Sequence, residues 1–253
     1  MKNIYKTYKT IYGQIIEKIS DNSGFLLSLI SGFLAVLIIR TFLSMLDTIF
    51  VGYEFPIQRI IFMISTGLLI MGLEIGYTKF IFEKIDNKNK NLGFIFNHFH
   101  ILGKYLKGLI IFYVIIFIFF LPCILFCLYK YGIEFIDILS GMIMDPYFQE
   151  LAISFYDLNQ LILVISIFAL LPAYIMIRLY FWSYFIIDQN LDGKKAIAES
   201  WKITKDRNFE IIIFSIFIML FNVLGILTII GMCVTAPLSY LFLCLYFRHL
   251  NSK

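Results

Sequence analysis

Charged side chains within long apolar stretches are the residues of this chain best suited to do chemistry. Glu74 and Arg178 each lie in such a stretch, and a second arginine, Arg40, lies in another. A charge near the centre of an isolated membrane helix costs about 2.5 to 3.5 kcal/mol, so each group needs a partner or a function. We expect Glu74 and Arg178 to lie at similar depth and to pair. Within a cavity, such a pair could bind a charged solute or respond to protons.

The same three residues also fit a structural role, which the sequence favours. Glu74 and Arg178 could form a buried bridge that fixes two helices, or could extend their charged ends toward the membrane surface. Arg40 could likewise reach Asp47 or Glu54. The sequence leaves these alternatives open.

Other reactive residue types are not arranged for catalysis or metal binding. His98 and His100 stand two positions apart, which on a helix turns their side chains about 200° from each other, so we expect both at a surface. The four cysteines form no Cys-x-x-Cys pair and are predicted to be free packing residues. No phosphate-binding glycine loop, H-E-x-x-H or G-x-S-x-G motif is present. We therefore predict no enzyme activity, no cofactor and no metal site.

The charged residues must be positioned by apolar stretches that are long enough to cross a membrane. The chain of 253 residues is 60% hydrophobic and only 15% charged, which lies outside the range of ordinary soluble domains. Crossing the hydrocarbon takes about 20 apolar residues. We predict an all-α, polytopic integral membrane protein that forms a single transmembrane domain over residues 1–253. Its six transmembrane helices are expected at 24–46, 57–80, 108–129, 158–187, 209–227 and 232–248.

The basic residues lie in three clusters that alternate with connections poor in lysine and arginine. The clusters precede the first span, separate the second span from the third, and separate the fourth from the fifth. Under the positive-inside rule these segments are cytoplasmic. This predicts that the protein lies in a bacterial cytoplasmic membrane with both termini on the cytoplasmic side. Since membrane orientation accounts for the basic residues, no nucleic-acid partner is expected.

Three segments beside the spans combine an apolar face with a basic face. Residues 1–20, 91–107 and 192–205 have this pattern, and we expect interfacial cytoplasmic helices there. Their partners would be the anionic headgroups of the lipid bilayer and a membrane or cytosolic protein. The acidic outer connection over 130–157 is predicted to hold a short helix that does not cross. The glycines between 225 and 231 predict a tight helical hairpin.

The segment after the fourth span carries a resemblance to known families. Asp188 ends the span, Ala196 and Ser200 have the Ala-x-x-x-Ser spacing of a short helix, and Pro237 lies in the last span. These residues resemble the pattern of a family of six-span bacterial membrane proteins, the DUF975 family, and of the membrane domain attached to some glycerophosphodiester phosphodiesterases. The resemblance covers about the last 80 residues. It implies a six-span membrane protein and no activity, because those phosphodiesterases catalyse with a separate soluble domain.

Three hypotheses about function are compatible with the sequence. The leading one is a non-enzymatic membrane protein that serves as a subunit or regulator in transport or envelope homeostasis. The second is a small-solute transporter or channel with a site between spans two and four, where Glu74 and Arg178 would lie. The third is an immunity or stress protein that protects the membrane by occupying it.

Overall fold

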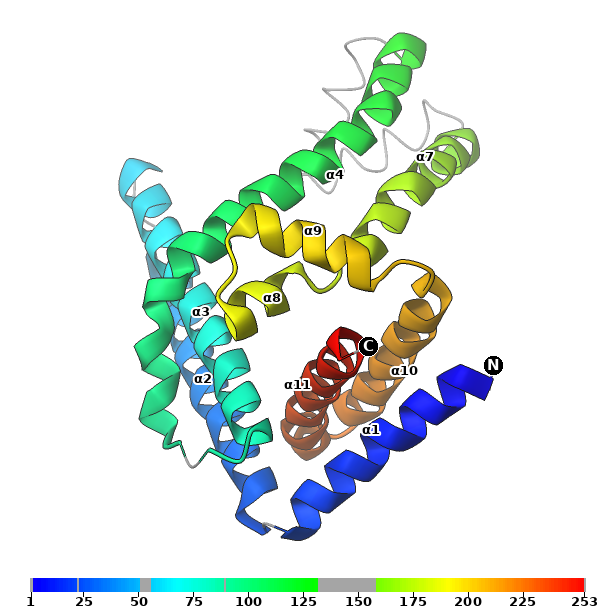
Figure 1. Cartoon of the computed structure of the whole chain (residues 1–253). Helices are drawn as coiled ribbons and strands as arrows, with labels where there is room; N and C mark the ends of the chain where they lie inside the picture. Colours follow the sequence, from blue (N-terminus) through cyan, green and yellow to red (C-terminus); the bar gives the residue numbers. More distant parts are fainter. Residues whose placement is uncertain (1, 22, 51–55, 89, 132–157, 253) are drawn as a thin grey trace. The chain divides into compact units, whose positions relative to one another are not determined.

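The computed structural model describes residues 2–21, 23–50, 56–88, 90–131 and 158–252, and every element in these ranges is a helix (Figure 1). The predicted short helix of the outer connection lies outside the described residues. The elements are α1 (Lys2–Asp21), α2 (Ser23–Phe50), α3 (Pro56–Ile85), η1 (Leu92–Ile101), α4 (Leu102–Tyr131), α7 (Leu158–Arg178), α8 (Trp182–Gln189), α9 (Gly193–Ile203), α10 (Asn208–Ile226) and α11 (Ile229–Asn251).

The predicted fold class is confirmed, because the described chain holds six helical segments long and apolar enough to cross a membrane. They correspond to α2, α3, η1 with α4, α7 with α8, α10 and α11. Large apolar side chains remain exposed along these helices, for example Ile38, Ile61 and Leu220. Apolar surface on this scale suits contact with lipid rather than with water. The chain is therefore a multi-pass membrane protein by architecture.

The helices form two compact units. The first contains residues 1–108 and 181–253, and the second contains residues 109–180. In the second unit the continuation of α4 and the helix α7 meet through the rings of Phe126 and Phe168, whose centroids are 5.6 Å apart. Cys123 is buried and free in this unit, in agreement with its predicted packing role. Helix α4 starts in the first unit and supplies the chain connection into the second.

A close backbone contact between α3 and η1 organises the first unit. A Cβ atom at Gly76 would collide with the carbonyl oxygen of Ile95, so only glycine lets the two backbones approach this closely. Gly72, one helical turn earlier, makes the equivalent space for the ring of Phe99. The segment expected as one interfacial helix over 91–107 is instead a 3₁₀ helix packed on α3, followed by the first turns of α4.

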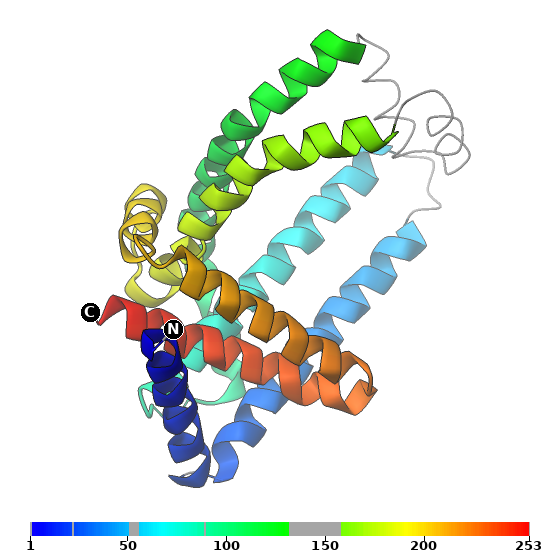
Figure 2. The same cartoon turned by 90° about the vertical axis from the view of Figure 1, so that its right-hand side faces the viewer.

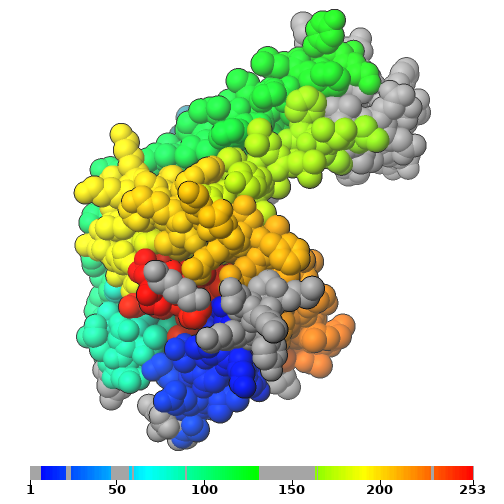
Figure 3. Space-filling model, turned by 45° about the vertical axis from the view of Figure 1, so that its right-hand side comes forward, coloured from blue at the N-terminus to red at the C-terminus, as the bar shows by residue number. Residues whose placement is uncertain are grey.

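The apolar face of α1 packs against protein. Ile11 and Ile15 are buried, and the helix contacts α2 and α11. Tyr8 stacks on Phe214 of α10 with ring centroids 5.8 Å apart. Figure 2 and Figure 3 show α1 beside the carboxyl end of α11. The periodic pattern of α1 thus predicted a real apolar face, and much of that face meets α2, α10 and α11.

The fourth predicted span, 158–187, is interrupted. Helix α7 ends at Arg178, and α8 begins after the turn at Phe181. Phe181 lies between the two helices, and its amide donates a hydrogen bond to the Ser200 side chain on α9, at 3.1 Å. Ser200 is fully buried, so this bond satisfies an amide that water cannot reach. No glycine or proline marks the break, which is why the sequence predicted one continuous helix.

The predicted hairpin after α10 is confirmed. Helix α10 ends at Ile226 and α11 begins at Ile229, and the two run antiparallel side by side (Figure 2). Thr228 caps α11, because its side chain accepts a hydrogen bond from the amide of Gly231 at 3.1 Å. The turn is short because glycine and a threonine cap satisfy its backbone within three residues.

Candidate functional site

Arg248, near the end of α11, is the centre of an ion cluster in the first unit. Its Nη2 atom lies 2.7 Å from Oδ1 of Asp188 and 3.2 Å from Oδ2 of Asp86. Asp188 lies in the last turn of α8, and Asp86 directly follows α3. One guanidinium therefore joins the ends of three helices. We call this region, together with the carboxyl half of α1, the polar end of the first unit.

Two asparagines with left-handed backbone end the helices that carry the acidic residues. Asn87, with φ of 59°, follows Asp86, and Asn190, with φ of 57°, is the C-cap of α8. Asparagine tolerates this conformation better than most residues and commonly ends helices. Lys104 of α4 donates to both the backbone oxygen and the Oδ1 atom of Asn190, at 3.1 and 2.8 Å. These local stops fix both carboxylates in front of Arg248.

The bond between Asp188 and Arg248 is shielded, whereas the bond between Asp86 and Arg248 is not. The Asp188 side chain is 6% exposed, and those of Arg248 and Asp86 are each 37% exposed. The guanidinium also lies over the ring of Phe82, 5.3 Å from its centroid. A shielded carboxylate without a cation is strongly destabilising, so Asp188 depends on Arg248. The exposed pair with Asp86 contributes about 1 kcal/mol or less.

A second set of charges lies beside this cluster. Glu83 accepts from Lys88 at 3.0 Å and lies 3.8 Å from Lys79. Hydrogen bonding to the Glu83 carboxylate raises the pKa of Lys88 above its ordinary range. Lys79 also donates to the backbone oxygen of Asp188 at 3.1 Å, which links the two clusters. The polar end is therefore a network in which most cations already have an anionic or carbonyl partner.

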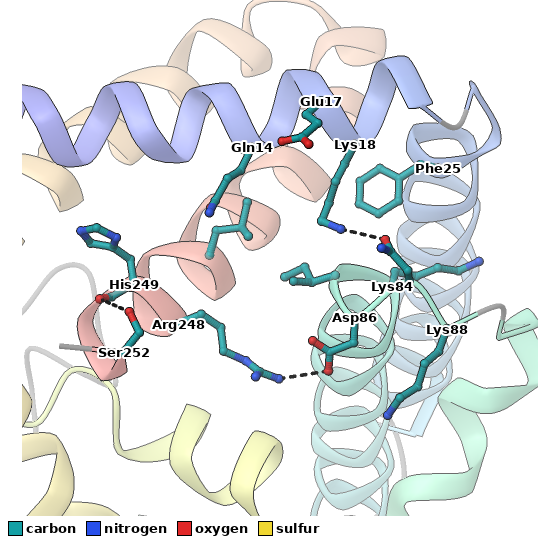
Figure 4. A pocket seen from close by; sticks show the side chains of 13 residues that line it. Gln14, Glu17, Lys18, Phe25, Lys84, Asp86, Lys88, Arg248, His249 and Ser252 are labelled. Carbon is teal, nitrogen blue, oxygen red and sulfur yellow. Dashed lines mark hydrogen bonds and ion pairs between the residues drawn. The ribbon is translucent and has the colours of Figure 1, made fainter.

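A cavity of about 890 Å³ opens at the polar end between α1, α3 and α11 (Figure 4). Figure 4 shows Gln14 and Lys18 of α1 extending toward the space, with Arg248 and Asp86 on the opposite side. The Nζ atom of Lys18 donates to Oδ1 of Asn87 at 2.8 Å. The volume is within the range typical of small-molecule sites. The arrangement can hold an anionic group against cationic and amide donors.

The residues that carry the family resemblance have separate positions. Asp188 belongs to the ion cluster. Ala196 and Ser200 are fully buried on the inner face of α9, where Ser200 holds the amide of Phe181. Pro237 is buried within α11. One of the four residues is therefore at the candidate site, and the other three shape the packing of α9 and α11.

The charges predicted within the spans lie away from this cavity. Glu74 pairs with Arg40 through a contact of 3.1 Å between Oε1 and Nη1. Both side chains are open, at 42% and 59% exposure, and Arg40 also lines a small cavity of about 260 Å³ on α2. Arg178 is buried and belongs to the second unit. Its pairing with Glu74 stays a prediction.

The sequence reasoning missed Arg248, Asp86 and Lys18. Each sits at a helix end, where charge is common and draws no notice. A usable signal was present: Arg248 ends a predicted span, and Asp188 and Asp86 follow predicted spans, on the same side of the membrane under the proposed topology. Opposite charges at the same depth are candidate ion pairs, and these three residues met that condition.

His98 differs from its expected surface position. It is buried, and its Nδ1 atom lies 3.0 Å from the backbone oxygen of Phe94. Helix η1, which carries His98, packs against α3 and α2. Among the described residues, no group of three or more His, Cys, Asp or Glu side chains could hold a metal ion.

Comparisons with protein-family models, with curated proteins and with solved structures give no match to this chain. The site is accordingly defined by its own geometry: an arginine held by two carboxylates beside an open, mainly cationic cavity.

Proposed function

We propose that this chain is a non-enzymatic protein of a bacterial cytoplasmic membrane that serves as a subunit or regulator in transport or envelope homeostasis. Both termini would lie in the cytoplasm, and a relationship to the DUF975-like six-span proteins is part of the proposal. The observation that carries it is the convergence of the ends of α3, α8 and α11 on Arg248, beside an open cavity. An open cavity beside an organised set of charges is suited to binding a ligand or a partner.

The outer face of α9 supports a recognition role. Lys194, Lys195 and Lys202 are exposed, and the Trp201 side chain is 40% exposed beside them. The opposite face of α9 is buried through Ala196, so the helix is held firmly while its basic side stays open. An exposed tryptophan is typical of protein interfaces and of membrane headgroup regions, and the lysines beside it suit an anionic partner.

A deletion strain complemented with variants tests this function. We expect the wild-type gene to restore solute uptake or resistance to envelope stress, and a Trp201→Ala, Lys194→Gln, Lys195→Gln variant to fail at equal protein abundance. Phe209→Ala is the matched control, because Phe209 is an exposed aromatic residue outside α9. Full complementation by the triple variant would contradict a role for this face.

Solute transport is the second candidate, and a different observation favours it. The ion pair between Arg40 and Glu74 lies within two helices able to span the membrane and is open rather than enclosed. An open charge pair in a span needs water, a solute or another helix beside it. Thr41 and Ser44 line the small cavity next to Arg40, whereas Phe42, equally exposed, is not among its lining residues.

Cysteine labelling separates the two functions. In a background without native cysteines, an impermeant thiol reagent should label Thr41→Cys and Ser44→Cys, but not Phe42→Cys, if water reaches the pair. Equal protection of all three positions from both sides would remove the transporter hypothesis and leave the regulator.

A further inference from the structure

We propose that the cavity between α1, α3 and α11 binds the phosphate of an anionic phospholipid headgroup. The inference rests on the membrane setting of the proposed function but not on the regulatory role. The charged residues that line the cavity are Lys18, Lys84, Lys88 and Arg248 against Glu17 and Asp86. Behind this wall Glu83 pairs with Lys88 and Asp188 pairs with Arg248, so an anionic ligand would have to bind Lys18 and Lys84.

The cations of the cavity differ in how far they are already neutralised. Lys88 is bound to Glu83, and Arg248 is bound to Asp188 and Asp86. Within the described ranges, neither Lys18 nor Lys84 has a carboxylate within ion-pair distance. These two lysines can supply positive charge to a ligand.

Lys18 has the geometry of a phosphate ligand. Its ammonium donates to the neutral amide oxygen of Asn87 at 2.8 Å, on the wall of the cavity. A phosphate oxygen is a stronger acceptor for an ammonium than an amide oxygen, because the hydrogen bond then joins opposite charges. Lys84, whose Nζ lies 5.3 Å from the centroid of the Phe80 ring, can turn toward the same anion without breaking an ion pair seen in the described residues.

The apolar part of the wall favours a lipid over a free phosphate. Phe25, Ile85 and Leu245 line the cavity together with the charged groups. Phe25 is the second residue of the first candidate span and Ile85 is the last residue of the second, so the cavity lies where spans meet the headgroup layer. A phospholipid matches both parts of the wall, because its phosphate can contact the charged residues while its glycerol backbone and acyl chains contact the apolar ones.

Helix α1 presents apolar side chains to its surroundings and polar side chains to the cavity. Tyr12 and Ile16 are exposed on α1, at 59% and 49%, while Gln14 and Lys18 of the same helix line the cavity. Exposed apolar residues on an amphipathic helix enter the headgroup region of a bilayer. A helix held in that layer would bring Lys18 to the depth of lipid phosphates.

Binding by the purified full-length protein tests the proposal. The probes are short-chain phosphatidylglycerol, short-chain phosphatidylcholine and inorganic phosphate, each titrated against the detergent-solubilised protein, with bound ligand counted by native mass spectrometry. We expect phosphatidylglycerol to bind more tightly than the other two probes. Lys18→Gln should weaken that binding about tenfold, the effect of losing one charge-assisted hydrogen bond. Lys107→Gln, an exposed lysine of α4 that does not line the cavity, is the control and should leave binding unchanged.

A second variant keeps the test decisive if Lys18→Gln folds poorly. Asn87→Asp keeps the contact with Lys18 but places a carboxylate against the ammonium, so phosphatidylglycerol should again bind about tenfold more weakly. Equal binding of inorganic phosphate with the same dependence on Lys18 would overturn the lipid assignment. Binding that is absent, or unaffected by both variants, would overturn the site itself. Neither result depends on complementation of a deletion strain, so failure of the regulatory function remains distinguishable.

Discussion

The Nη2 atom of Arg248 lies 2.7 Å from Oδ1 of Asp188, and this contact joins the last helix of the chain to the end of α8. The carboxylate is shielded, whereas the guanidinium is partly open and also reaches Asp86. The pair is thus asymmetric: Asp188 depends on Arg248 more than Arg248 depends on Asp188.

Replacing Arg248 should destabilise the protein more than replacing a surface lysine. Arg248→Gln leaves Asp188 shielded without its cation, and we expect a loss of about 2 to 3 kcal/mol, below the value for a fully buried pair because Arg248 is partly exposed. Thermal unfolding in detergent measures the loss. Lys202→Gln, which breaks an exposed pair with Glu199, should cost about 0.5 kcal/mol. Adding Asp188→Asn to Arg248→Gln should recover part of the stability, and strict additivity would contradict the coupling.

Because of the close contact between α3 and η1, we expect alanine substitutions at two glycines of α3 to change the stability in opposite directions. Gly76→Ala puts a methyl group against the carbonyl of Ile95 and should destabilise by about 1 to 3 kcal/mol through forced backbone movement. Gly67→Ala meets open space within α3 and should stabilise by about 0.5 to 1 kcal/mol. Unfolding of both variants in parallel tests the contact, and an equal effect of the two substitutions would argue against it.

Ser200 should matter for the break between α7 and α8. Ser200→Ala removes the acceptor of the Phe181 amide in a buried position, for an expected loss of about 1 to 3 kcal/mol. Hydrogen exchange at Phe181 should accelerate at the same time. Ser31→Ala is the control, since the Ser31 hydroxyl donates to the backbone oxygen of Leu27 within its own helix, and it should change stability by less than about 0.5 kcal/mol. Unchanged exchange at Phe181 would contradict this role.

The proposed orientation can be measured in intact cells. Lys194→Cys, on the exposed face of α9, should react with an impermeant thiol reagent only after the cytoplasmic side is opened. Asp145→Cys, in the acidic connection, should react from outside. The reverse pattern would invert the topology and move the polar end to the outer surface.

The sequence predicts the parts of this fold that depend on local properties. Apolar length identifies the six spans, and closely spaced glycines predict the hairpin before α11, because both features act within one segment. The break at Phe181 could not be predicted, since a buried serine on α9 rather than a local glycine or proline stabilises it. The 3₁₀ helix likewise depends on the space that Gly76 leaves on α3.

Of the three residues in the ion cluster, the sequence singled out only Asp188. Asp188 was singled out by resemblance, but its partner Arg248 lies 60 residues later and its neighbour Asp86 lies in another connection. Such a cluster requires knowledge of which helix ends meet, and no periodic pattern encodes that. The sequence predicted Arg178 as the partner of Glu74, and the structure shows Arg40 at 3.1 Å from it.

The joint at Arg248 also has a consequence for the order in which the protein is assembled. Asp188 is synthesised 60 residues before Arg248, so its carboxylate has no contact with this arginine until α11 has been made. The contacts of the guanidinium with both aspartates therefore form only after α11 has been synthesised. Helix α11 thus completes both the ion cluster and the cavity beside α1, because it supplies Arg248 to the first and part of the lining of the second.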